Sequence, residues 1–446
     1  MLSLFVERKK KRINEMNDKK LNILFINRWV GYNEGGNETH IKDLLDQFSK
    51  SGHKVTVITT EGRSLDYLKD KVHIEYVKGI HGYYSYRFLG FLYAFVFNFK
   101  CFVKFIELNR DLRRKGERFD VLSVHFSLEA FLARFIKLFF GTPYVLVLAG
   151  DTQLELIEGK RADGRIAISN FMNDQCKKYG YSSEIIPKGI DLNKFNPNIN
   201  FKDLYERERL DGKIPLLTVC RLDPRKDLIT LIKCANEIVN KRKRKEFVFI
   251  IVGEGVERRR LEEKIKEYSL EANVKLAGGI PNSNDLLTKY YAMCKLFVLP
   301  TLYEGFGWVY IEAMASGLPI ITTRVGSNEE IVGDIGVLIE PRNPILLADT
   351  ILSTLSDKYK LERMKKNGLE KAKKYSWDNT VFRYEDYYSR VSKVRCDGIK
   401  CKLIVAWDTF VDTVAILYSF VVSIFPSKRK IYDGNWNGSG QEGMNS

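Results

Sequence analysis

Two glutamates flank a short glycine-rich turn in the last third of the chain. The stretch Tyr303–Pro319 reads YEGFGWVYIEAMASGLP, and seven residues separate Glu304 from Glu312. The apolar run KLFVLP before it predicts a strand, and the residues from about Gly307 predict a helix that ends before Gly317. The turn therefore joins the carboxyl end of a strand to the amino end of a helix, where free N–H groups favour an anion.

The two acids must have another purpose, because a carboxylate repels a phosphate. Glu304 lies in the turn and is expected to face a neutral group that carries hydroxyls, such as a sugar. Glu312 lies more than one turn into the helix, where a carboxylate can accept hydrogen bonds from a ribose diol. The alternative is a helix that merely happens to contain two glutamates. The agreement between the turn chemistry and the helix position argues against that alternative.

Positive charge that could bind phosphates follows another expected strand. Arg221 ends the run PLLTVC, and Lys226 follows in RLDPRK. Both residues lie at the carboxyl end of a strand, where α/β sheets bind their ligands. An arginine fork and a lysine point charge together suit a diphosphate.

The elements that position these residues alternate between short apolar strands and helices. We expect strands at 21–27, 55–59, 119–125, 142–150, 215–220, 247–253, 273–278, 295–300, 318–323 and 336–340. This alternation is typical of doubly wound parallel sheets, and it breaks into a polar linker at 191–214. Two such arrays predict an α/β fold with two Rossmann-like domains facing a cleft.

The remaining segments follow from composition. We expect a basic amino-terminal tail at 1–20, domains at 21–190 and 215–376, a helix at 377–395 that returns towards the first domain, an apolar and basic segment at 396–432, and a disordered tail at 433–446. Seven cysteines without a C-x-x-C pair or zinc spacing indicate a reduced, cytoplasmic compartment. The start, MLSLFVERKKKR, has too short an apolar stretch for a signal peptide.

The net charge of +16 favours an anionic partner. The basic runs are dispersed and no nucleic-acid motif is present, so nucleic acid is not expected and an acidic membrane surface is preferred. The stretch 403–425 has the length of a membrane span but contains Asp408 and Asp412. We expect an interfacial or hairpin-like contact with the cytoplasmic membrane face, or else a helix packed on the protein. The aromatic stretch 88–108 is expected to be a long domain helix.

The stretches around the two glutamates and around Arg221 and Lys226 resemble those of a known family. The stretch 303–341 is similar to the E-x7-E region of the retaining group 1 (family four) glycosyltransferases and to the residues that follow it. CRLDPRKD resembles the Arg–Lys donor motif of that family. The runs GYNEGGNETH, FDVLSVHFS, ADGRIAISNFMNDQC, IIPKGIDLNKF and IIVGEGVERRRLE match as well. The resemblance spans about residues 21–390. It implies a GT-B fold with an acceptor domain and a nucleotide-sugar domain, to which the apolar stretch 403–425 adds a carboxyl-terminal helical extension.

The resemblance also implies roles for single residues. Arg221 and Lys226 would bind the diphosphate of a nucleotide sugar, and Glu312 would bind its ribose. The donor site would further include Gly35, Gly36, Gly253, Ile280, Glu304, Gly305, Phe306 and Gly307. Among these, Glu304 and the amides of the glycine turn would hold the sugar, the backbone near Ile280 would read the base, and Gly35 and Gly36 would close on the phosphates.

His125 would lie near the reaction centre. A histidine at the end of a buried strand is often a satisfied core residue, but the carboxyl end of a strand faces the cleft, which favours function. The chain departs from the family pattern at three places: Asp227 stands where glycine is usual, Lys188 replaces an asparagine, and Ala149 replaces a histidine, for which Asp151 could substitute.

The expected chemistry breaks an anomeric C–O bond through a cation-like transition state. The chain has no Asp-x-Asp pair to hold a metal, so Arg221, Lys226 and the helix amino end would stabilise the leaving diphosphate. We therefore predict metal-independent catalysis without a cofactor, and the resemblance implies retention of configuration. A nucleotide-sugar epimerase on the same fold is the first alternative. A nucleic-acid-binding protein is the second.

Overall fold

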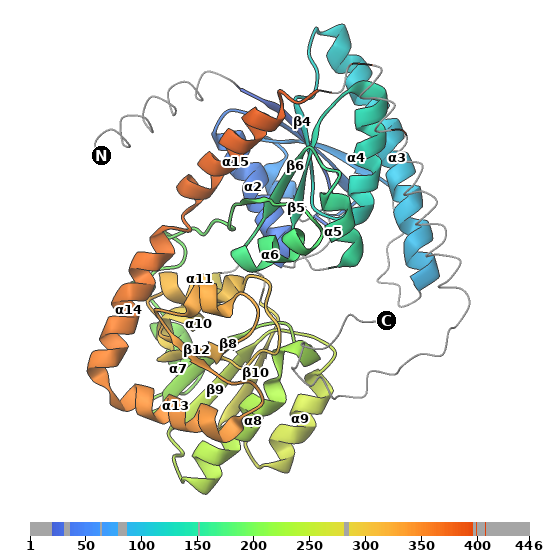
Figure 1. The fold of residues 1–446 in the computed structure, drawn as a ribbon. Helices are drawn as coiled ribbons and strands as arrows, with labels where there is room; N and C mark the ends of the chain where they lie inside the picture. The colour runs from blue at the N-terminus through green and yellow to red at the C-terminus, as the bar shows by residue number, and fades with distance from the viewer. Residues whose placement is uncertain are drawn as a thin grey trace.

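The computed structural model of the chain describes residues 20–30, 36–62, 65–78, 87–149, 152–280, 285–395, 398 and 406. These residues form two α/β domains, each built on one parallel sheet (Figure 1). The expected fold class, two Rossmann-like domains in the GT-B arrangement, is confirmed. Of the expected membrane-contact segment at 396–432 only residues 398 and 406 are described, so that expectation lies almost wholly outside the described residues.

The amino-terminal domain contains a seven-stranded sheet in the order β3-β2-β1-β4-β5-β6-β7. Strands such as β1 are buried along their whole length, because helices cover a parallel sheet on both faces. The strands are β1 (Asn22–Ile26), β2 (Lys54–Thr60), β3 (His73–Val77), β4 (Val121–Val124), β5 (Tyr144–Leu148), β6 (Gly164–Ala167) and β7 (Glu184–Ile185). The helices are α2 (Gly36–Lys50), η1 (Asp66–Leu68), α3 (Arg87–Arg114), α4 (Ser127–Phe140), α5 (Gln153–Gly159) and α6 (Asn170–Lys178).

The carboxyl-terminal domain contains a six-stranded sheet in the order β10-β9-β8-β11-β12-β13. Its strands are β8 (Ile214–Val219), β9 (Phe247–Val252), β10 (Val274–Gly278), β11 (Leu296–Leu299), β12 (Ile320–Thr323) and β13 (Val337–Ile339). Its helices are α7 (Lys202–Arg207), η2 (Pro224–Lys226), α8 (Leu228–Asn236), η3 (Glu237–Lys241), α9 (Arg258–Glu267), α10 (Asp285–Met293), α11 (Trp308–Ala315), α12 (Asn328–Val332), α13 (Pro344–Ser356) and α14 (Lys358–Lys373).

The described residues contain the ten strands that the sequence predicts and three that it does not. β3, β6 and β7 were not expected because their sequences, HIEYV, GRIA and EI, are short or carry charged residues. Partly buried strands with such sequences lack the continuous apolar run that marks the central strands. The expected long helix at 88–108 is present as α3.

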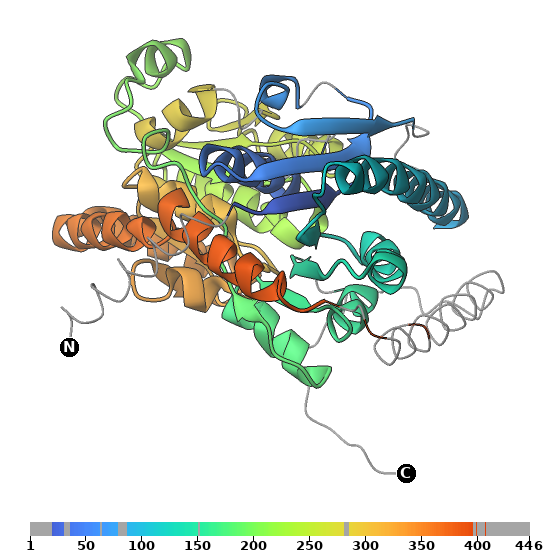
Figure 2. The same cartoon turned by 90° about the horizontal axis from the view of Figure 1, so that it is seen from above.

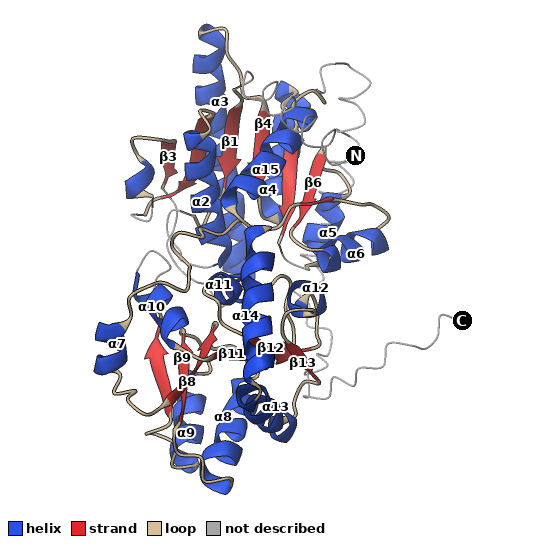
Figure 3. Ribbon diagram, turned by 90° about the vertical axis from the view of Figure 1, so that its left-hand side faces the viewer, coloured by secondary structure: helices blue, strands red, loops and turns tan. Residues whose placement is uncertain are grey.

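The last helix, α15 (Trp377–Val391), connects the two domains (Figure 3). It follows α14 of the carboxyl-terminal domain and packs against α2, β5 and β6 of the other domain. Tyr384 and Tyr388, both fully buried, belong to a hydrophobic core cluster that includes side chains of both domains. No helix within the described ranges is long and apolar enough to cross a bilayer.

Candidate active site

Both sheets reverse their strand order at one point, and the predicted site residues follow the strands on either side of it. The reversal lies between β1 and β4 in one sheet and between β8 and β11 in the other. His125 directly follows β4, whereas Arg221 and Lys226 follow β8 and Glu304 follows β11. Ligands of open α/β sheets bind beside such reversals, at the carboxyl ends of the strands.

Lys226 and Glu304 form the central ion pair of the carboxyl-terminal domain. The Lys226 ammonium donates to Glu304 Oε2 at 2.7 Å, and each side chain is 15% exposed. The expected diphosphate-binding lysine and the expected sugar-binding glutamate thus lie in contact, although 78 positions separate them in the chain. Removing one member would leave the other as a largely buried charge without its partner.

Backbone contacts hold the two loops of this pair together. The amide of Leu302 and the hydroxyl of Thr301 both donate to the carbonyl of Arg225, at 2.7 and 2.9 Å. Gly253, in the loop after β9, has φ of 148°, and a Cβ there would overlap the Cys220 carbonyl oxygen. Only glycine allows this approach, so Gly253 positions the backbone beside Arg221 rather than contributing a side chain.

The glycine-rich turn has the geometry that its sequence predicts. Gly307 adopts φ of 75° and precedes the first residue of α11, which begins at Trp308. The carbonyl of Gly305 accepts a hydrogen bond at 2.9 Å from the Ser169 hydroxyl of the other domain. A Cβ at Gly305 would meet no atom within 4 Å, so the space beside this residue is open.

Glu312 is only 2% exposed and lies beside a tyrosine that the sequence does not single out. The Tyr291 hydroxyl donates to Glu312 Oε2 at 2.6 Å. Burial and the neighbouring Glu312 raise the pKa of Tyr291 well above its ordinary value, so the phenol stays a donor. One Glu312 oxygen is thereby oriented by Tyr291, and binding of ribose by this carboxylate stays a prediction.

Arg221 differs from Lys226 in exposure. Its side chain is 68% exposed and lies 3.3 Å from Asp223, whose carboxylate also caps η2 through the amide of Arg225. Burial raises the pKa of the intervening Cys220 to about 12, and the charges of Lys226, Asp223, Glu304 and Arg221 all act on that thiol. Three predicted donor residues, Arg221, Lys226 and Glu304, therefore lie within electrostatic range of Cys220.

His125 lies on the opposite side, at the end of β4, and is 4% exposed. Its Nε2 is 3.3 Å from Ser123 Oγ, which in turn hydrogen-bonds with the Tyr388 hydroxyl at 2.6 Å. Burial, assisted by the charge of Lys188, lowers the pKa of His125 to about 3. A neutral imidazole is therefore present at physiological pH, tied through Ser123 to α15.

Lys188 is a buried cation near the first turn of α2. It is 6% exposed, and its ammonium donates at 2.5 Å to Asn37 Oδ1 in the first turn of α2. Burial lowers the pKa of Lys188 to about 8, while Glu38 and Glu304 oppose that shift. Lys188 also acts on His40 and His125, whose pKa values burial lowers. Lys188 thus links the histidines of one domain with Glu304 of the other.

A second contact between the domains lies beside the glycine turn. The carboxylate of Glu330 in α12 accepts from the amide of Asn170 at 3.0 Å, from its side-chain amide at 2.8 Å and from the amide of Phe171 at 3.3 Å. A carboxylate at these first helical amides also complements the dipole of α6. No local sequence pattern marks Glu330 or Ser169 as residues of the site.

The remaining expected residues divide into two groups. Gly36 is the first residue of α2, and Ile280 is a half-buried residue just beyond β10. Gly35 and Asp151 lie outside the described residues. Within the described ranges no three His, Cys, Asp or Glu side chains are grouped to hold a metal ion. Metal-independent catalysis stays a prediction.

Comparison with known families agrees with this arrangement. A family model described as Glycosyl transferases group 1 matches residues 202–371, and one described as Glycosyltransferase Family 4 matches residues 34–194. The two matches together contain both sides of the candidate site. The chain belongs to the group 1 glycosyltransferases.

Known proteins resemble this glycosyltransferase along most of its length. An uncharacterized glycosyltransferase of Methanocaldococcus jannaschii is 26% identical over 377 residues, 77% of this chain and 92% of that protein. The UDP-Gal:alpha-D-GlcNAc-diphosphoundecaprenol alpha-1,3-galactosyltransferase of Escherichia coli is 27% identical over 279 residues, 57% of this chain and 70% of the relative. Anabaena HepE in complex with UDP and glucose aligns with a TM-score of 0.67 and 19% identity, covering 83% of this chain and 98% of its own, and this likeness shows the fold.

The structure explains one departure of this glycosyltransferase from its family pattern. Asp227 has φ of 46° and ψ of 44°, a left-handed conformation that favours glycine. Aspartate is among the few other residues enriched in that region. Its carboxylate also accepts from the Thr230 hydroxyl at 2.7 Å, so the side chain stabilises the first turn of α8.

Proposed function

We propose that this glycosyltransferase transfers a sugar from a nucleotide-diphosphate sugar to a hydroxyl acceptor, with retention of anomeric configuration and without a metal ion. The observation that carries the proposal is the contact between Lys226 and Glu304, at 2.7 Å, beside the amino end of α11. A cation, a hydroxyl-binding carboxylate and a helix amino end then meet at one strand reversal. A diphosphate joined to a sugar can be bound by these three groups together, the cation and helix end at the phosphates and the carboxylate at the sugar hydroxyls.

The proposed reaction needs stabilisation of the leaving group more than proton transfer. As the anomeric C–O bond breaks, its electron pair leaves with the diphosphate, whose charge Lys226 and Arg221 would stabilise. The acceptor oxygen would bond to the anomeric carbon on the same face, and its proton would pass to the departing phosphate. Glu304 would hold sugar hydroxyls, and the neutral His125 would lie on the acceptor side.

We further propose an acceptor that is a glycan or is linked to a lipid. The Escherichia coli relative is named for an acceptor linked to diphosphoundecaprenol. The net charge of +16 on this chain suits an anionic membrane. The protein would then work at the cytoplasmic membrane face as a peripheral enzyme. A lipid-linked acceptor would bring its own phosphates, which adds to the demand for positive charge.

An epimerase acting on the same donor is the rival function. It would need acid and base groups that exchange protons with the sugar. The low pKa of His125 makes this residue a poor proton donor at neutral pH. Conversion of a nucleotide sugar to its epimer without any acceptor would favour the rival, whereas release of nucleoside diphosphate that depends on an acceptor would favour transfer.

Thermal stabilisation by a panel of UDP, GDP and ADP sugars, each with and without EDTA, tests the donor site. We expect one nucleotide class to raise the melting temperature, with no loss on adding EDTA. Glu304→Gln, which keeps the shape and removes the charge, should weaken the shift. Arg225→Gln is the matched control, because this neighbouring side chain is 56% exposed and pairs with Asp223 rather than Glu304. A shift that requires a divalent metal would contradict the proposal.

A further inference from the structure

Helix α3 exposes apolar side chains on the face opposite to the one that it buries. Phe97, Cys101 and Phe105 are buried against the sheet. The opposite face carries four large apolar side chains at spacings of four, four and three residues, and their exposed fractions are 61%, 62%, 42% and 39% for Phe95, Phe99, Val103 and Ile106. A helix on the surface of a globular domain normally has polar residues there, and an exposed apolar patch marks an interaction site.

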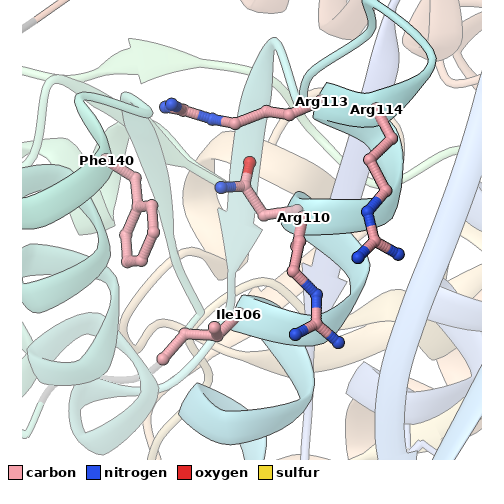
Figure 4. A pocket seen from close by; sticks show the side chains of 6 residues that line it. Ile106, Arg110, Arg113, Arg114 and Phe140 are labelled. Atoms are coloured by element: carbon pink, nitrogen blue, oxygen red, sulfur yellow. The ribbon is translucent and has the colours of Figure 1, made fainter.

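The same face becomes basic in the last turn of α3. Arg110, Arg113 and Arg114 follow Ile106 and line a groove of about 400 Å³ together with Phe140 of α4 (Figure 4). In Figure 4, the Arg113 side chain extends to the side of Phe140, whereas the side chains of Arg110 and Arg114 point away from Phe140. Phe139 of α4 continues the apolar surface, since it is 58% exposed and its ring lies 6.3 Å from that of Phe102.

The arginines of α3 differ from the other arginine run of the chain. Arg258, Arg259 and Arg260 of α9 each form an ion pair with a glutamate one turn away, which is the ordinary state of a solvated helix face. In α3, Arg114 pairs loosely with Asp111 at 3.4 Å. Among the described residues Arg110 and Arg113 form no ion pair, so their charge is available to an external anion.

We propose that this face of α3, from Phe95 to Arg114, docks on an anionic lipid bilayer. Phe95 and Phe99 would enter the boundary between headgroups and acyl chains, and the arginines would bind lipid phosphates. A protein partner fits less well. The four exposed side chains offer on the order of 400 Å² of apolar surface, whereas a specific protein interface buries roughly 1,200 Å² or more. The apolar stripe ends in three arginines, two of which form no ion pair among the described residues, and this order matches the layered chemistry of a membrane surface.

The position of α3 suits this role. The helix lies at the outer edge of the amino-terminal domain, beside α4 (Figures 1 and 2). Helix α3 runs antiparallel to the strands of its sheet. The apolar end of α3 therefore lies near the carboxyl ends of the strands, and its arginine end lies near their amino ends. Docking would hold the acceptor side of the enzyme against the bilayer that carries a lipid-linked acceptor. This purpose rests on the proposed function, but the docking itself does not.

Flotation of the full-length protein with vesicles tests the proposal without any substrate. The vesicles contain phosphatidylcholine alone or mixed with phosphatidylglycerol, at low and at physiological salt. Against the mixed vesicles, Phe95→Ser with Phe99→Ser should lower the partition coefficient roughly tenfold or more. Arg110→Gln, Arg113→Gln and Arg114→Gln together should lower it by a similar factor and weaken its dependence on salt.

Two controls match these changes. Arg258→Gln, Arg259→Gln and Arg260→Gln remove the same charge from α9, and Val256→Ser with Tyr359→Ser removes apolar side chains that are 87% and 79% exposed. Both controls should float as the wild type does. The α3 variants should keep the donor-induced shift in melting temperature, which shows that they fold and separates this test from that of the function. Unchanged flotation of both α3 variants would overturn the proposal and would assign any binding to another segment, such as residues 396–446.

Discussion

The two sides of the candidate site use charge in opposite ways. On the carboxyl-terminal side, Lys226 and Glu304 form a partly exposed ion pair, and Arg221 extends into solvent. On the amino-terminal side, His40 and His125 are buried, and burial lowers the pKa of both imidazoles. One domain therefore presents fixed charges to a ligand, whereas the other presents neutral groups whose positions depend on packing against α15.

This difference fits the proposed roles of the two domains, with the donor bound on the charged side and the acceptor on the neutral side. A charged donor needs preorganised charge, which loops at a strand reversal can supply with little packing. An uncharged acceptor hydroxyl needs a dry, neutral surface, which requires a packed core. Lys188 is the exception, because it is a cation on the neutral side, and the charge of Glu304 in the other domain opposes the lowering of its pKa by burial.

The largest effect is expected from the charged side. Lys226→Met should lower the rate of transfer by about 10³-fold or more, because it removes the charge proposed to stabilise the diphosphate and leaves Glu304 without this partner. Steady-state kinetics with the donor identified by thermal stabilisation measures this loss. Arg225→Gln, in the same loop, should stay close to wild type. If Lys226→Met kept most of the activity, the charge would not be used for the leaving group.

The next effect concerns the packing of the donor loops. Gly253→Ala should destabilise the carboxyl-terminal domain by about 2–4 kcal/mol, because the new Cβ overlaps the Cys220 carbonyl oxygen and the φ is unfavourable. Gly305→Ala is the matched control for stability, since its Cβ would meet no atom within 4 Å. Urea unfolding measures both variants. Equal stability of the two would show that the loop after β9 can move away from β8.

On the neutral side, the expected effect depends on pH. Because the pKa of His125 is lowered to about 3, the unfolded chain takes up a proton below pH 6.5 that the folded protein does not. The stability associated with neutral His125 is therefore complete above pH 6.5 and is lost as the pH falls towards 3.

His125→Asn should remove this loss. The difference in unfolding free energy between wild type and variant should change by about 1.4 kcal/mol per pH unit below the ordinary histidine pKa. Urea unfolding at a series of pH values provides the measurement. The same slope for His125→Asn and wild type would mean that the folded protein accepts the proton.

The smallest effect is expected where the two sides meet. Lys188→Asn restores the usual family residue and should lower the transfer rate by roughly tenfold or less. Removing this cation also lets the pKa of His125 rise, so the acid limb of the pH–rate profile should move to higher pH. Lys188→Met, which keeps the bulk, should show the same move. If neither variant moved the acid limb, the histidine would be insulated from Lys188.

Local sequence accounts for most of the fold and for the donor side. The apolar runs predicted ten of the strands, because a covered parallel strand must be apolar along its length. The sequence predicts the turn around Gly307, because a glycine between a strand and a helix typically marks a tight turn with a left-handed backbone. The sequence does not predict the short strands β3, β6 and β7, because pairing with neighbouring strands, rather than an apolar run of their own, holds them in extended conformation.

The sequence by itself determined the alternation of strands and helices, the glycine turn, and the types of residue at the strand ends, because each depends on a few adjacent residues. Only the tertiary structure decided the partners of these residues. Tyr291 orients Glu312, Ser169 binds the carbonyl of Gly305, and Tyr388 reaches Ser123 across 265 positions of the chain. Such contacts depend on how the domains and α15 pack, and no local pattern encodes that packing.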